Sequence, residues 1–333
     1  MLRFVLRRFW FLVVVLFGVS LLTFLIANVA PGDPARMAAG PSATPEAVAA
    51  LRAEWGLDQP LIEQYFRYLG RLAHFDLGTS NVTGRPVLDE ILARAPATIE
   101  LMVAALLLAL VVGVPLGVWA ALRRGSWVDS LVRGLATLGV SVPAFWLGLL
   151  LILLFYRTLG WLPGSGRFMG DPPTAMTGFL TLDALLHGDW AAFRLACAHL
   201  VLPVASLALL DLGQVARLVR NQLLAVLSQD YIRVARASGL PERAVVYRHA
   251  LRNAVSPLIT VIAASIAQML YGSVSIELVF GWPGAGQYVV NSIFNLDFPV
   301  IMGFALLTSG VYVVANLGAD LAYAWLDPRV RAR

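Results

Sequence analysis

Five stretches of this chain run for at least 20 residues without a charged side chain, and they limit the folds open to the sequence. A helix needs about 20 mostly apolar residues to cross the hydrocarbon core of a bilayer. Charged residues make up only 14% of the chain, against about 25% in soluble domains. The sequence therefore predicts an all-α polytopic membrane protein. The uncharged stretches are residues 9–30, 101–122, 134–156, 254–276 and 300–319.

A sixth, weaker span is expected at residues 200–219, which contain Asp211, Gln214 and Arg217. Its length suits a crossing. An even number of crossings is also needed to place both ends of the chain on the same side of the membrane. Three arginines precede the first stretch, as they do in a signal peptide. Its 22 apolar residues exceed the usual length of the apolar part of a signal peptide, so we expect an uncleaved first span. We therefore expect six transmembrane helices in a single domain over residues 1–333.

The placement of arginine predicts the orientation. All 25 basic residues are arginine, and 16 of them fall on one side if the N-terminus is cytoplasmic. Because cytoplasmic loops carry the excess of positive charge, both termini are expected in the cytoplasm. Residues 31–97 and 157–199 are then external. Within the first of these, Thr44-Pro45-Glu46 predicts the start of a helix, with a capping hydroxyl, proline at the first position and an acid near the positive end of the dipole.

Several kinds of chemistry are excluded or disfavoured. Without lysine the chain cannot hold a standard P-loop or form a Schiff base. Cys197 forms no intrachain disulfide, and the four histidines are not at metal-ligand spacing, so no metal site is expected. The glycine-rich residues 281–286 follow a membrane helix and predict a tight external turn instead of a nucleotide site. No catalytic arrangement is apparent, and the arginine excess reflects topology, not nucleic-acid binding.

Residues 230–253 form one arginine-rich segment between two apolar spans. They predict two short helices hinged at Gly239-Leu240-Pro241, too polar to lie in lipid. An element of this kind in a membrane protein is typical of a surface presented to a soluble partner. The alternative is that its arginines anchor the loop at anionic lipid headgroups. Those most directly concerned are Arg233, Arg236, Arg248 and Arg252.

Polar side chains inside the spans are candidates for the substrate pathway, because burying such groups in lipid is costly. The candidates are Asp211, Gln214, Gln268 and Asn316. The alternative for the amides is hydrogen bonding between helices. For Asp211, an internal ion pair with Arg217 and a charge in the pathway are both open. Kinks are expected at Pro143 and Pro203.

Several motifs in a fixed order resemble one family along nearly the full chain: the permease subunit of bacterial binding-protein-dependent ATP-binding-cassette importers of the dipeptide, oligopeptide and nickel group. The docking loop departs from the broader importer motif, which begins Glu-Ala-Ala where this chain has Arg233-Val234-Ala235. The peptide-type group shares that departure. The motifs are residues 30–34, 76–80, 84–87, 230–254, 277–286 and 316–329.

The resemblance implies a type I importer transmembrane domain in the bacterial inner membrane, which itself catalyses no reaction and holds no cofactor. It implies a second homologous permease, an extracytoplasmic substrate-binding protein, and two cytoplasmic P-loop ATPases that hold ATP and Mg²⁺. The implied ATPase-docking residues are Arg233, Ala235, Arg236, Gly239, Leu240, Arg248 and Arg252.

The motifs do not separate dipeptide, oligopeptide, glutathione, nickel-chelate or opine cargo, nor a homodimeric from a heterodimeric pair of permeases. A secondary transporter that uses Asp211 or Asp320 as a proton or sodium site is a different class of protein. The lack of an internal repeat argues against it, and it leaves the arginine-rich loop unexplained. A membrane enzyme has no catalytic arrangement to support it.

Overall fold

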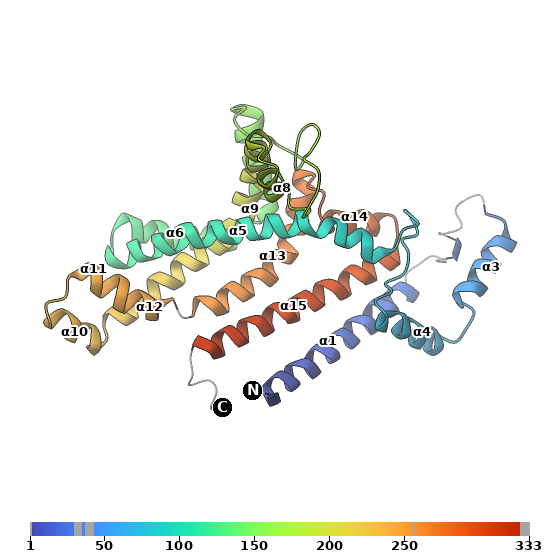
Figure 1. Ribbon diagram of the computed structural model, residues 1–333, viewed down its shortest axis with the longest axis horizontal. Helices are drawn as coiled ribbons and strands as arrows, with labels where there is room; N and C mark the ends of the chain where they lie inside the picture. Colours follow the sequence, from blue (N-terminus) through green and yellow to red (C-terminus); the bar gives the residue numbers. More distant parts are fainter. Residues whose placement is uncertain (1, 30–34, 37–42, 256, 327–333) are drawn as a thin grey trace. The chain divides into compact units, whose positions relative to one another are not determined.

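The computed structural model describes residues 2–29, 35–36, 43–255 and 257–326 (Figure 1). Within these ranges the chain forms helices and no β-strand, apart from one isolated antiparallel bridge between Thr79 and Pro86. The predicted all-α class is confirmed. The motif residues 30–34 and 327–329 lie outside the described residues.

The chain divides into two compact units. The first comprises residues 1–95 and 284–313, and the second comprises residues 96–283 and 314–333. Two long helices contribute residues to both units: α5 (Val87–Leu122) and α15 (Phe298–Leu326).

The first unit has its core where α4 packs on α1, around Phe24, Tyr65, Tyr68 and Leu306. Thr44 caps α3 through its hydroxyl, which accepts a hydrogen bond from the Ala47 amide at 3.3 Å, so the predicted helix start is confirmed. The helices that lie wholly in this unit are α1 (Leu2–Val29), α3 (Pro45–Trp55), α4 (Leu61–Ala73) and α14 (Ala285–Phe294).

The second unit is organised around α9 (Trp190–Leu227), which packs against most of the other helices of this unit. α8 lies beside the start of α9, and α12 packs near its end (Figure 1). The other elements are α6 (Trp127–Ser141), α7 (Ala144–Leu151), the π-helical η1 (Ile152–Thr158), α8 (Leu180–Leu186), α10 (Asp230–Ala237), α11 (Glu242–Ala244), the π-helical η2 (Val245–Ala250), α12 (Leu251–Ala254) and α13 (Leu258–Phe280).

Glycines let α6 and α9 approach closely. A Cβ atom added at Gly213 would lie 2.7 Å from the Cα of Ala136, and one added at Gly139 would lie 2.9 Å from the Cα of Leu210. Small residues at helix contacts are the usual solution in membranes, where packing, and not the exclusion of water, holds helices together. α6 is therefore fixed on α9 along its length.

Five of the described helices are long and apolar enough to cross a membrane. They correspond to the expected spans one, two, four, five and six, with the fifth beginning and ending four residues later than predicted, and α5 and α9 extend well beyond the predicted 101–122 and 200–219. The five helical stretches are Trp10–Asn28, Val87–Leu122, Trp190–Leu227, Leu258–Phe280 and Phe298–Gly318.

The expected third span, residues 134–156, falls within a bent pair of helices that together are long and apolar enough to be a sixth crossing. It is not one helix: α6 ends at Ser141, α7 begins at Ala144, and the two are bent by 106°. Pro143 has no amide hydrogen, and its ring disfavours helical backbone at the preceding residue. Val142 is accordingly extended, with φ −103° and ψ 119°. A break therefore stands where the sequence predicted a kink, while Pro203 lies within a continuous α9.

Candidate functional site: an exposed helix pair and buried polar groups

Residues 230–254 form the predicted pair of helices. α10 ends at Ala237, the chain turns at Gly239, and a second helical run of α11, η2 and α12 follows. Gly239 has φ +78°, in the left-handed region that favours glycine. The helix–hinge–helix prediction is confirmed, and we call residues 230–254 the helix pair.

The underside of the helix pair is apolar and buried. Ile232, Val245 and Ala250 have no exposed surface. They pack into one cluster with Leu223 of α9 and Val118 of α5. The helix pair thus packs on α9 by hydrophobic contact, within a cluster that also includes residues of α5.

A bidentate ion pair between Arg236 and Glu242 links the two sides of the hinge. Arg236 donates from Nε to Glu242 Oε2 at 3.0 Å and from Nη2 to Glu242 Oε1 at 2.7 Å. These hydrogen bonds hold the pKa of the Glu242 carboxyl below its usual range. The Asn253 amide also donates to the Tyr231 hydroxyl at 2.9 Å and links the two helices. The angle between them is therefore set by specific polar contacts as well as by the turn.

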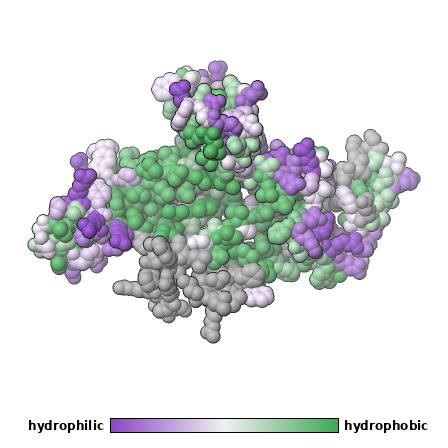
Figure 2. All heavy atoms as spheres, in the orientation of Figure 1, coloured by the Kyte–Doolittle hydropathy of each residue, from purple (hydrophilic) through white to green (hydrophobic). Residues whose placement is uncertain are grey.

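The outer face of the helix pair combines arginine with exposed apolar side chains. Val234 is 64% exposed and Tyr247 is 54% exposed. Arg233, Arg248 and Arg252 are also exposed, and Figure 2 shows hydrophilic residues gathered at the α10–α11 end of the molecule. Exposed apolar and aromatic side chains among arginines are typical of a surface that binds another protein.

The implied docking residues differ in their surroundings. Leu240 is exposed and Ala235 is half-buried, whereas Arg236 is engaged across the hinge. Arg233 makes only a long contact of 3.4 Å with Asp230. Within the described part of the chain, neither Arg248 nor Arg252 forms an ion pair. Those two arginines are the freest to meet a charged partner.

Asp211 is 2% exposed on α9 and accepts a hydrogen bond from the Ser265 hydroxyl of α13. Among the described residues no ion pair joins it to Arg217, which is exposed. The ion-pair alternative for Asp211 is therefore not supported, and its place in a pathway stays a prediction.

The other pathway candidates differ in exposure. Gln214 is half-buried one turn further along α9, Gln268 is exposed on α13, and Asn316 is half-buried on α15. The Asp320 side chain lies outside the described residues. The hydrogen bond between Asp211 and Ser265 is a polar contact between α9 and α13.

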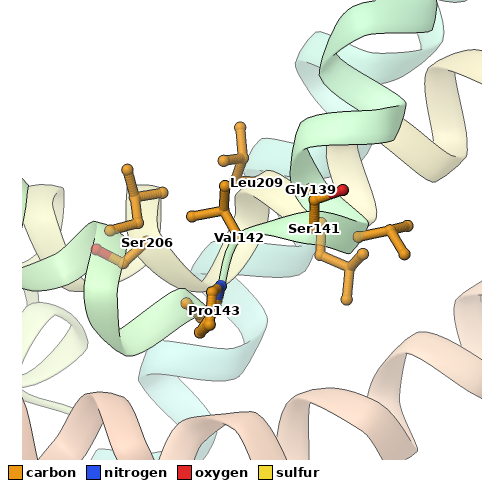
Figure 3. Close-up of a pocket in the computed structure, with 10 residues that line it drawn as sticks. Gly139, Ser141, Val142, Pro143, Ser206 and Leu209 are labelled. Carbon is orange, nitrogen blue, oxygen red and sulfur yellow. The ribbon is translucent and has the colours of Figure 1, made fainter.

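A cavity at the break between α6 and α7 was missed by the sequence reasoning. It has a volume of about 250 Å³, and Figure 3 shows Ser141, Val142, Pro143 and Ser206 around it. Leu209 and Leu210, which precede Asp211, also line it. Non-helical backbone at membrane depth is tolerated where it lines a cavity, and broken helices in transporters mark binding sites. Pro143 within an uncharged stretch was the feature of the sequence that could have indicated this break and its cavity.

Two acids that were not among the candidate pathway residues are also buried. Asp129 at the start of α6 has no exposed surface and pairs with Arg220 of α9 at 2.5 Å. Glu277 is equally buried and accepts a hydrogen bond from the Thr98 hydroxyl at 2.7 Å. The signal for Asp129 was a lone acid in a connection of arginines, a pattern that predicts pairing.

Glu100 of α5 fastens the segment that follows η1. Arg167 donates to Glu100 Oε2 at 2.5 Å, and the backbone amide and hydroxyl of Thr181 donate to Oε1 at 2.8 and 2.6 Å. Asp183 closes the same turn. Burial raises the pKa of Asp183, but hydrogen bonds from Thr177 and Gly178 lower it by more, so the pKa lies below its usual value.

The described residues hold no group of three or more His, Cys, Asp or Glu side chains that could bind a metal ion. The described part of the chain therefore offers no candidate set of metal ligands.

Comparison with known proteins gives consistent matches over the chain. A family model described as "Binding-protein-dependent transport system inner membrane component" matches residues 113–332, and its N-terminal companion matches residues 1–102. The chain is 52% identical over 326 residues to the probable D,D-dipeptide transport system permease protein DdpB of Escherichia coli K12, covering 97% of this chain and 96% of that protein.

Two further relatives are similar over almost their whole length. The chain is 40% identical to the dipeptide transport system permease protein DppB of Escherichia coli K12, covering 99% of both chains. It is 41% identical to the di/tripeptide transport system permease protein DppB of Pseudomonas aeruginosa, again covering 99% of both.

Proposed function

We propose, on the premise that this chain belongs to the family of binding-protein-dependent transport system inner membrane components, that it carries short peptides through the membrane. As a member of that family it is a multi-pass permease of the inner membrane, with the membrane domain of a type I ATP-binding-cassette importer. The names of its relatives, which specify dipeptides and tripeptides, support peptide cargo.

The observation that carries the proposal is the helix pair. Its underside is packed on α9, within a cluster that also includes residues of α5, while its outer face exposes Val234, Tyr247 and three arginines. Such a surface suits docking of a cytoplasmic ATPase subunit. ATP and Mg²⁺ would be held by that partner and not by this chain.

The complete importer would contain a second, homologous permease, two ATPase subunits and an external substrate-binding protein. The arginine distribution supports cytoplasmic placement of both termini and of the helix pair. Closure of the ATPases would push the pair, and its seat on α9 would pass the movement to the membrane helices. This is alternating access driven from outside the membrane domain.

Asp211 is the residue we assign to the cargo route. Asp211 does not itself line the cavity at the α6–α7 break, but it directly follows Leu209 and Leu210, which do. A carboxylate there would favour the free amino group of a peptide. The Ser265 hydroxyl would orient it.

The test of docking is co-purification of the importer with its ATPases. Val234→Glu adds a charge at a side chain that is largely exposed, so the fold is expected to persist while ATPase binding is lost. Leu186→Glu is the matched control, because Leu186 is 63% exposed on α8, at the other end of α9. Normal ATPase recovery with Val234→Glu, or equal loss with both variants, would contradict the proposal.

A further inference from the structure

Of the described residues, two arginines and no acid line a cavity in the first unit. It has a volume of about 350 Å³ and lies among α1, α4, the turn after α4 and the start of α15. Its polar lining includes Gln64, Arg67, Tyr68, Arg71 and Asn81. Phe24, Leu77, Phe298 and Met302 supply much of the apolar lining. A site with this balance suits a ligand that has an anionic part and an apolar part.

The polar groups offer donors. Arg67 donates one hydrogen bond to the Gln59 side chain at 2.6 Å, so most of its guanidinium N–H groups remain available to a ligand. In the described part of the chain Arg71 forms no ion pair, and the buried Asn81 Nδ2 has no hydrogen-bond partner. Burial raises the pKa of Tyr68 to about 12, so its hydroxyl keeps its proton near neutral pH. An acceptor-only anion such as a phosphate would complement these groups.

The cavity lies at the boundary between membrane and water. Its lining includes Ala27 and Asn28 at the end of one membrane-crossing helix and Phe298 and Pro299 at the start of another. A cavity at this depth faces the level of lipid headgroups.

α4 itself has the character of an interfacial helix. Gln64, Arg67 and Arg71 lie along one flank, and Tyr65 and Tyr68 pack on α1 from the middle of its inner face. On the opposite flank Ile62 and Phe66 are exposed apolar side chains. A helix with this division lies in the plane of the membrane surface, with its apolar flank in the lipid.

We propose that this cavity binds an anionic phospholipid, with its phosphate at Arg67, Arg71 and Asn81 and an acyl chain along Phe24 and Met302. Among the described residues neither arginine forms an ion pair with a carboxylate, which favours a lipid with net negative charge over a zwitterionic one. The bound lipid would fasten α4 to the ends of α1 and α15. The site lies outside the helix pair and does not depend on the proposed transport.

Native mass spectrometry of the full chain in detergent tests this inference, with phosphatidylglycerol and phosphatidylethanolamine as probes. We expect the wild type to retain one phosphatidylglycerol in preference to phosphatidylethanolamine. Arg71→Gln should weaken that retention about tenfold, since a hydrogen bond to a charged group is lost. The double variant Arg67→Gln, Arg71→Gln should abolish it. Arg194→Gln, which changes an exposed arginine of the second unit, is the control.

Competition identifies the source of the anion. Millimolar inorganic phosphate or dialanine should leave the bound phosphatidylglycerol in place, because neither carries an acyl chain. Displacement by either would overturn the lipid assignment, as would equal retention of both lipids or no difference between Arg71→Gln and Arg194→Gln. If the double variant unfolds on heating at a clearly lower temperature, Arg71→Gln and Asn81→Ala decide the question.

Discussion

The helix pair and residues 163–183 are both attached to the long helices of the second unit, but by different means. The helix pair rests on an apolar underside, and its ion pair Arg236–Glu242 is open to solvent, at 42% and 59% exposure. Residues 163–183 are held through Arg167–Glu100, at 17% and 6% exposure. An apolar seat transmits force while tolerating small rotations, whereas a buried network of directed hydrogen bonds fixes one arrangement. We infer that the first region moves with a partner and the second stays fixed.

Removing Glu100 should have the largest effect. Glu100→Gln leaves the largely buried Arg167 guanidinium without its counter-charge, and breaking such a pair costs about 3–5 kcal/mol. Thermal unfolding of the purified protein and proteolysis within residues 163–183 would measure the loss. Glu242→Gln is the matched change in the exposed ion pair and should cost less than about 1 kcal/mol. Equal destabilisation by the two variants would remove the distinction between the regions.

Truncating the seat of the helix pair should come next. Ile232 has no exposed surface, and Ile232→Ala should cost about 2–4 kcal/mol of local stability through the lost contacts and the cavity left behind. Hydrogen exchange of residues 230–254 would report the loosening. Val234→Ala, two residues along but largely exposed, should leave exchange unchanged. If both variants behave alike, the pair is not seated as the structure indicates.

The hinge should contribute a smaller amount. Open space surrounds a Cβ atom at Gly239, so Gly239→Ala is opposed only by its φ of +78°, at a cost of about 1–2 kcal/mol. Gly134, within α6, also has open space and no positive φ. Gly134→Ala should be neutral or stabilising by up to about 1 kcal/mol. A neutral Gly239→Ala would show that the turn is not fixed in this conformation.

Acid should release the ion pair across the hinge with the smallest effect. The pKa of Glu242 is lower in the folded chain than its usual value of 4.5. The stabilisation is therefore fully present above that usual value and is lost as the pH falls through the lower, folded value. Because both side chains are well exposed, the contribution is below about 1 kcal/mol. Proteolysis at residues 237–243 should increase in that acid range, and Arg236→Gln should remove this pH dependence.

Much of the helix pair could be predicted from the sequence. Gly239-Leu240-Pro241 between two arginine-rich runs is a local signal, because the turn chemistry and polarity are encoded within 24 residues. The N-cap at Thr44 was predictable for the same reason. The break at Val142-Pro143 was less predictable, because a proline can either bend a membrane helix or end it. Which of the two occurs here depends on packing against α9.

The buried polar contacts depend on residues far apart in the chain. Glu100 meets Arg167, 67 residues away, and Asp129 meets Arg220, 91 residues away. No local pattern encodes such a distance. The pairing of Asp211 with Arg217, one of two alternatives left open, followed helical spacing alone; Arg217 is exposed, and Ser265 of another helix donates a hydrogen bond to Asp211. Contacts within one helix were overestimated because contacts between helices could not be foreseen.

Site-directed cross-linking tests the central claim, that the helix pair is the contact with the ATPase. Cys197 is the only cysteine of the chain, so a Cys197→Ser background permits one new cysteine at a chosen position. A benzophenone maleimide would be attached at Val234→Cys, or at Leu186→Cys as control, in the assembled importer. We expect an ATPase adduct from position 234 and none from position 186. An importer that couples ATP hydrolysis to transport yet gives no adduct from position 234, or equal adducts from both, would contradict it.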